Sequence, residues 1–212
     1  MKPFALSRRQ MLENCISKGT LAAGTVALSQ SQLLAWWEQG EATAHKPTSS
    51  EVLGPFYRKG APNTATMRIA GEPGFPLRVT GKVMNTKGER IEGVKIGMWQ
   101  TDHKGLYDVQ GYRYRINLET SATEYAVETI MPGHYDDRPA QHIHYLISAP
   151  GHKTLITQAY FSTDPFFEGD PDKNYKKRNM VSSKELIRPV ALYEAPGEPR
   201  ATITFDIILE KA

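Results

Sequence analysis

The chain has 212 residues, 40% of them hydrophobic and 23% charged, which is typical of one globular domain of ordinary size. Its formal net charge of +3 is small and its longest basic runs are short, so no nucleic-acid-binding face is expected. The single cysteine, Cys15, excludes a disulfide bond within the chain.

The first 44 residues have the features of an export signal. SRRQML at residues 7–12 resembles the twin-arginine signature, and a weakly apolar stretch covers residues 19–28. Ala42-Thr43-Ala44 is a small-x-small cleavage site. We therefore expect a signal peptide over residues 1–44 and a periplasmic or secreted protein over residues 45–212. The alternative is an ordinary amphipathic helix, and the apolar stretch is too short and too polar to predict a membrane span.

The region after the signal is predicted to form mainly β-strands. Residues 77–84 alternate apolar and polar side chains, as a half-buried strand does. Pairs such as Pro-Gly and Asp-Pro mark turns between this and the other predicted strands. Short strands at this spacing, without long helical periodicity, predict an all-β antiparallel sandwich. The other predicted strands cover residues 94–99, 125–130, 142–149, 154–161 and 201–209.

Two polar segments fall outside the predicted strands. Residues 45–76 are rich in proline and glycine, and we expect them to form irregular coil along the edge of the sandwich. Residues 164–178 are polar, and we expect a long surface loop.

Two of the six histidines, His142 and His144, lie on one predicted strand. Because side chains alternate along a strand, both rings point to one face and Ile143 to the other. Their Cα atoms are then roughly 7 Å apart, close enough for both imidazoles to bind one metal ion. A zinc site built from thiolates is excluded, since Cys15 is the only cysteine. Such a pair is also found as a partly exposed polar face without any metal.

Two tyrosines could supply further metal ligands. Tyr135 follows a Pro-Gly turn just before the histidine strand, and Tyr107 ends the segment WQTDHKGLY at residues 99–107. A ferric ion would stabilise a phenolate well below its ordinary pKa of about 10. Two phenolates and two imidazoles would leave positions open for a bidentate substrate. The alternative for each tyrosine is a packing role at a strand end, with its hydroxyl in water.

Five ordered motifs resemble those of the intradiol ring-cleavage dioxygenases, and the resemblance extends from about Leu53 to Asp206. The motifs are LGPFY at 53–57, WQTDHKGLY at 99–107, TIMPGHY at 129–135, RPAQHIH at 138–144 and LITQAYFSTDP at 155–165. The resemblance implies the β-sandwich of this family and one non-haem Fe(III) per chain. It implies that Tyr135 is the ligand released when substrate binds. The implied metal ligands are Tyr107, Tyr135, His142 and His144.

The resemblance also implies two residues that act on the substrate. Arg138 resembles the arginine that stabilises negative charge on the substrate ring, and Gln158 corresponds to a glutamine near that arginine. Here one extra residue precedes His142, compared with the common family pattern R-P-x-H-I-H. A bulge could absorb it, or Arg138 could be displaced and replaced by Arg113 or Arg115.

The implied reaction inserts both atoms of O₂ into a catechol-type aromatic. It cleaves the ring between the two hydroxylated carbons and gives a cis,cis-muconate-type diacid. Catechol, hydroxyquinol, protocatechuate and bulkier catechols all remain candidate substrates. One alternative is a non-catalytic exported β-sandwich of the transthyretin-like or carbohydrate-binding kind, which would bind no iron. The other is a zinc hydrolase that uses the two histidines with Asp136 or Asp137.

Overall fold

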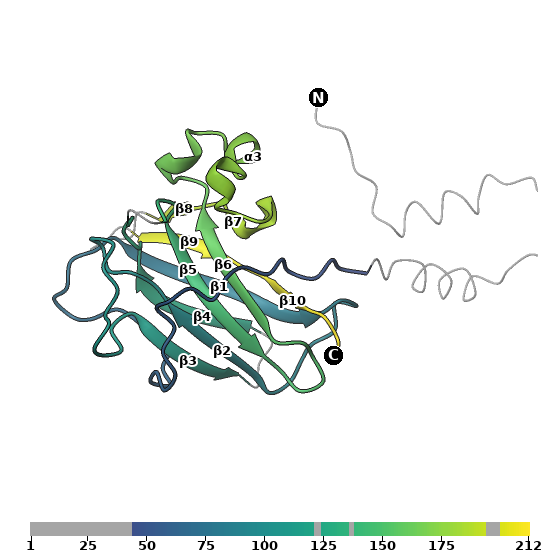
Figure 1. Ribbon diagram of the computed structural model, residues 1–212. Coiled ribbons are helices and arrows are strands. Elements are labelled where there is room, and N and C mark those ends of the chain that lie inside the picture. Colours follow the sequence, from purple (N-terminus) through teal and green to yellow (C-terminus); the bar gives the residue numbers. More distant parts are fainter. Residues whose placement is uncertain (1–43, 121–123, 136–137, 194–199) are drawn as a thin grey trace, which may run out of the picture. The chain divides into compact units, whose positions relative to one another are not determined.

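The computed structural model describes residues 44–120, 124–135, 138–193 and 200–212. The expected signal peptide therefore lies outside the described residues, apart from Ala44. Two five-stranded sheets form the body of the described part, as the all-β prediction requires (Figure 1). None of its helices is long and apolar enough to cross a membrane.

The first sheet is built around its longest strand, β1. β4 pairs antiparallel with one edge of β1, while β9 and β10 pair parallel with the other edge, and β8 pairs antiparallel with β9. The strands are β1 (Pro76–Asn85), β4 (Glu124–Ile130), β8 (Ala191–Tyr193), β9 (Arg200–Thr204) and β10 (Ile207–Leu209).

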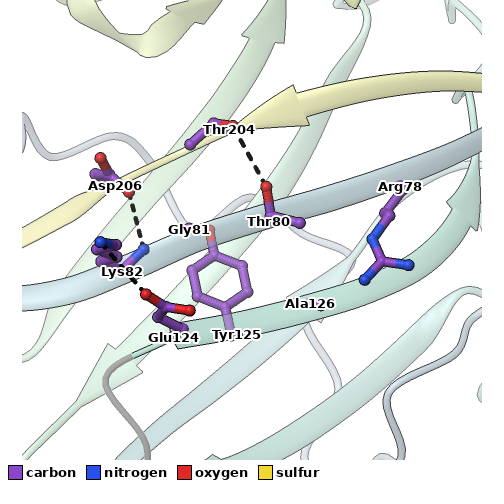
Figure 2. A pocket seen from close by; sticks show the side chains of 9 residues that line it. All are labelled: Arg78, Thr80, Gly81, Lys82, Glu124, Tyr125, Ala126, Thr204 and Asp206. Carbon is purple, nitrogen blue, oxygen red and sulfur yellow. Dashed lines mark hydrogen bonds and ion pairs between the residues drawn. The ribbon is translucent and has the colours of Figure 1, made fainter. Parts of the chain in front are cut away.

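The single strand predicted over residues 201–209 is wrong, because the structure divides it into β9 and β10. At the division, side chains form hydrogen bonds in addition to the backbone bond from the Phe205 amide to the Thr80 carbonyl. The Tyr125 hydroxyl donates to the Phe205 carbonyl at 2.7 Å, and the Asp206 carboxylate accepts from the Lys82 amide at 2.9 Å. Figure 2 shows Asp206 beside Lys82 on the outer face of the sheet, where Thr204 also meets Thr80.

The second sheet carries the histidines. Its order is β3-β2-β5-β6-β7, with all pairs antiparallel except β6 and β7. β3 was not predicted, because only Ile116 and Leu118 of its six residues are aliphatic; it forms by pairing along the whole of β2. The strands are β2 (Val94–Trp99), β3 (Arg115–Thr120), β5 (His142–Ser148), β6 (Leu155–Phe161) and β7 (Ile187–Arg188).

The hydrophobic core lies between the two sheets. β5 is buried on both of its faces: Ile143, Tyr145 and Ile147 belong to the core, while His142 and His144 point the other way and are also buried. The histidine face must therefore be covered by other parts of the chain. Other large core side chains include Leu77, Val79, Val83, Ile96, Met98, Val127, Phe161 and Phe205.

Two segments outside the sheets cover this face and one end of the sandwich. Residues 44–75 contain no strand in the structure, as predicted. The segment predicted as a loop over residues 164–178 instead contains short helices, which Figure 1 shows gathered beyond the ends of the strands near α3. Phe167 is fully buried, which fixes the first of these turns against the core. The helices are η1 (Pro165–Phe167), α3 (Pro171–Asn174), η2 (Lys177–Asn179) and, further on, η3 (Lys184–Leu186).

Candidate metal centre

The two histidines of β5 face one another. Their Nε2 atoms are 3.2 Å apart, and His142 Nδ1 donates to the Ala140 carbonyl at 2.7 Å. With the hydrogen on Nδ1, the Nε2 atom of neutral His142 carries a lone pair that faces His144. Metal–imidazole bonds are about 2.1 Å long, so two nitrogens at this separation can bind one ion together.

Burial keeps both imidazoles neutral. His142 and His144 are only 3% and 2% exposed. Desolvation lowers the pKa of His142 to about 4, and it holds the pKa of His144 well below its ordinary value, with His142 and Arg138 adding to the effect. Neutral imidazole is the form that binds metal ions. A cation at this site therefore does not compete with protons near neutral pH.

Tyr107 and Tyr135 complete the group. The Tyr107 hydroxyl lies 3.4 Å from His142 Nε2. The Tyr135 ring centroid lies 5.7 Å from that of Tyr107 and 5.9 Å from that of His142. Burial, and then the nearby Tyr135, raise the pKa of Tyr107, so this phenol ionises only when a cation compensates the charge.

Two turns joined by hydrogen bonds bring the tyrosines together. The Gly133 amide donates to the Asp102 carbonyl at 2.7 Å, and the Thr101 hydroxyl donates to the Gly133 carbonyl at 2.9 Å. A Cβ atom on Gly105, whose φ is +84°, would lie 1.7 Å from the His134 carbonyl oxygen. The glycines of both motifs are therefore needed so that the backbones can approach.

The donor set fits a ferric ion. Phenolate oxygen is a hard anionic ligand and imidazole suits iron as well as zinc. No group of three or more His, Cys, Asp or Glu side chains in the described part could hold a metal ion, so the further ligands that the described residues offer to the two histidines are the tyrosines. The carboxylates considered for a zinc hydrolase, Asp136 and Asp137, lie outside the described residues.

Arg138 stays beside the histidines despite the extra residue. Its amide donates to the Tyr135 carbonyl at 3.1 Å. Its guanidinium Nη2 donates to the Tyr160 hydroxyl at 2.7 Å and to the Met180 carbonyl at 3.0 Å. Nε is buried without a partner among the described residues. It is therefore a donor still available to a bound molecule.

A carboxylate and an amide support this arginine from behind. Glu51 Oε2 lies 3.4 Å from Arg138 Nη2, and the two side chains are only 7% and 14% exposed. Gln158 Oε1 accepts from the Tyr160 hydroxyl at 2.9 Å and so joins the same network. Gln158 also lies directly opposite His144 on the neighbouring strand. The sequence did not indicate Glu51, because its partner lies 87 positions away.

Aromatic rings cover the ligands. Phe56 stacks on Tyr107 with a centroid separation of 4.2 Å, and Trp99 stacks on His144 at 4.7 Å. Arg113 and Arg115, the two arginines considered as replacements for Arg138, have different surroundings. Arg113 pairs with Glu72 and is half exposed, whereas Arg115 is buried against Tyr107. The sequence did not predict these covering roles; the only signal for Phe56 was its place in LGPFY.

Comparisons with known proteins agree with this geometry. A protein-family model described as dioxygenase matches residues 52–211. Chlorocatechol 1,2-dioxygenase of Rhodococcus opacus is 32% identical over 194 residues, covering 77% of this chain and 72% of the relative. Catechol 1,2-dioxygenase of Acinetobacter baylyi is 29% identical over 195 residues and 77% of this chain, but the match covers only 62% of that relative.

The fold is also found in solved structures. One is the dioxygenase domain of a dioxygenase–carbohydrate-binding protein fusion from Streptomyces sp. SirexAA-E. It is 30% identical with a TM-score of 0.66, and the match covers 79% of this chain and 100% of that one.

Proposed function

Because the chain belongs to the intradiol ring-cleavage dioxygenase family, we propose that it cleaves a catechol-type aromatic between its two hydroxylated carbons. Both atoms of O₂ enter the product, a cis,cis-muconate-type diacid. The observation that carries this proposal is the convergence of two phenol rings with two neutral imidazoles, whose Nε2 atoms face one another. The names of the relatives support catechol, chlorocatechol or hydroxyquinol as the kind of substrate.

The proposed cofactor is one non-haem Fe(III) per chain. When bound, it would supply a Lewis acid that the two catechol oxygens chelate and that makes the ring carbons reactive toward O₂. Its ligands in this proposal are Tyr107, Tyr135, His142 and His144.

The two tyrosines have different surroundings, which supports different roles. Tyr107 is held on its ring by stacked Phe56 and by the guanidinium of Arg115, whose central carbon lies 5.7 Å from the ring centroid. Tyr135 meets Phe56 and Tyr107 edge-on. The family resemblance implies that Tyr135 is the released ligand, and we assign it as the group that moves and accepts a proton from an incoming catechol hydroxyl. Tyr107 keeps its position.

Arg138 orients the substrate in this proposal. Nη2 is held by Tyr160 and Met180, so the guanidinium cannot rotate freely, while buried Nε has no described partner. A fixed positive charge at this place stabilises negative charge that develops on the substrate ring. Gln158 contributes by fixing the Tyr160 hydroxyl.

We also propose that the enzyme is exported by the twin-arginine pathway and acts in the periplasm or outside the cell. SRRQML at residues 7–12 and the cleavage site at 42–44 support this. The twin-arginine route would allow the protein to fold and load iron before export. The proposed reaction consumes only the catechol and O₂, so no cytoplasmic reductant is required.

The test is metal analysis combined with turnover of a substrate panel. The protein is purified from iron-replete cells and assayed with catechol, chlorocatechols, hydroxyquinol and protocatechuate, and products are identified by mass spectrometry. We expect one iron per chain, a tyrosinate-to-Fe(III) absorption band and a product that carries both atoms of ¹⁸O₂. His144→Ala should lose iron and activity together. Equimolar zinc without a visible band, or no turnover of any catechol by an iron-loaded protein, would refute the proposal.

A further inference from the structure

Arg115, the first residue of β3, carries a buried guanidinium that contacts the Tyr107 ring and has no role in substrate binding in the proposal above. Only 2% of it is exposed. Nη1 donates to the Phe56 carbonyl and Nη2 to the Asp108 carbonyl, while Nε has no partner among the described residues. Burial accordingly lowers the pKa of Arg115.

Arg115 forms no ion pair with a carboxylate among the described residues. Every ion pair in the described part involves other side chains. The Asp108 carboxylate instead accepts the amides of its own loop, from Gln110, Gly111 and Arg113. A buried cation costs free energy unless a negative charge lies nearby. The Asp108 carboxylate interacts with Arg115 electrostatically but forms no ion pair with it, so Arg115 has no directly paired anion among the described residues while Tyr107 is a neutral phenol.

The group beside Arg115 is Tyr107. The guanidinium carbon lies 5.7 Å from the Tyr107 ring centroid, and Phe56 stacks on the same ring at 4.2 Å. Because Arg115 holds the Phe56 carbonyl, it fixes the stacking partner as well as contacting the ring. In the proposed enzyme Tyr107 becomes a phenolate when iron binds, which places a negative charge next to this cation.

We propose that Arg115 is the counter-ion of the Tyr107 phenolate in the iron-loaded enzyme and sets how strongly that phenolate donates to the metal. Arg115 acts through Tyr107 and is therefore a positioning residue. This inference rests on the proposed function, because Tyr107 is expected to carry that charge only when it binds the metal.

The absorption band reports this interaction directly. Excitation moves an electron from the phenolate to the iron and removes negative charge from beside Arg115. Because the cation contacts the Tyr107 ring, it stabilises the ground state more than the excited state. Loss of the positive charge should therefore move the band to longer wavelength, whereas loss of a purely structural contact would lower stability without this shift.

The experiment compares Arg115→Gln with Arg115→Lys. Both variants keep a donor for the two carbonyls, but only lysine keeps the charge. Arg58→Gln is the matched control, because Arg58, like Arg115, connects the coil before β1 with the loop before β3. Its Nη1 donates to the Gly111 carbonyl at 3.0 Å, and its guanidinium lies over Tyr112, which is not a ligand. Each iron-loaded protein is examined by visible spectroscopy and urea unfolding.

Arg115→Gln should move the band to longer wavelength by roughly 10 nm or more, from the Coulomb energy of a cation at this distance. Arg115→Lys and Arg58→Gln should keep the wild-type maximum. If the Gln variant does not fold, Arg115→Met replaces it, because methionine fills the space with apolar atoms. In a Tyr107→Phe background the Arg115→Gln shift should disappear.

Equal shifts in the Gln and Lys variants, or no shift in any variant of a coloured wild-type protein, would overturn this inference and leave the proposed function intact. A wild-type protein without iron or a visible band would instead overturn the proposed function.

Discussion

Replacement of Gly105 by alanine should weaken metal binding, although Gly105 is not a metal ligand. Gly105 has a φ of +84°, and a Cβ atom there would lie 1.7 Å from the His134 carbonyl oxygen. Since ordinary contact begins near 3.4 Å, the two turns must separate by about 1.7 Å. That displacement carries Tyr107 away from Tyr135. It exceeds the tolerance of a metal site, which is roughly 0.5 Å.

The free-energy cost has two parts. A left-handed backbone costs an alanine about 1 kcal/mol, and forcing packed elements apart adds about 1–3 kcal/mol. We therefore expect Gly105→Ala to lower the free energy of unfolding of the metal-free protein by about 2–4 kcal/mol. Gly71→Ala is the matched control. Gly71 has a φ of +78°, with nothing within 4 Å of its added Cβ, so only the backbone cost of about 1 kcal/mol applies.

Urea unfolding of the metal-free variants measures the first effect, and iron titration measures the second. Gly105→Ala should bind iron at least ~10-fold more weakly than wild type, by analogy with losses of groups that position ligands. Gly71→Ala should bind iron normally. If the two variants are equally stable and bind iron equally well, the close approach of the turns does not position Tyr107 and this reasoning is wrong.

Three further predictions concern single side chains and the signal. Tyr135→Phe should keep iron but lose roughly 100-fold or more in turnover. When catechol is added anaerobically, its absorption spectrum should become the same as that of the wild-type protein. If the two spectra stay as different as they are without catechol, Tyr135 is not the released ligand. Glu51→Gln removes the carboxylate beside Arg138, so turnover should fall roughly 10-fold with iron content unchanged, and wild-type kinetics would show that Glu51 does not position the arginine. Replacement of Arg8 and Arg9 by lysine should retain the precursor in the cytoplasm of the native host, as cell fractionation would reveal; normal export of this variant would contradict the signal assignment.

The sequence by itself predicted the features that depend on local pattern. Side chains alternate along any strand, so residues 77–84 and 142–149 could be assigned before any partner was known, and β1 and β5 cover nearly the same residues. The same rule placed His142 and His144 on one face, where the structure has them. Motif order indicated the family, which the comparisons confirm.

Only the tertiary structure decided what covers and supports the site. Arg115 lies in β3, which the sequence did not predict because only two of its six residues are aliphatic. This segment becomes a strand by pairing with β2. Phe56 and Glu51 come from coil without periodicity, and each meets a partner more than 50 positions away. Such contacts form where packing leaves a buried charge or ring to be covered, and a one-dimensional pattern does not contain that information.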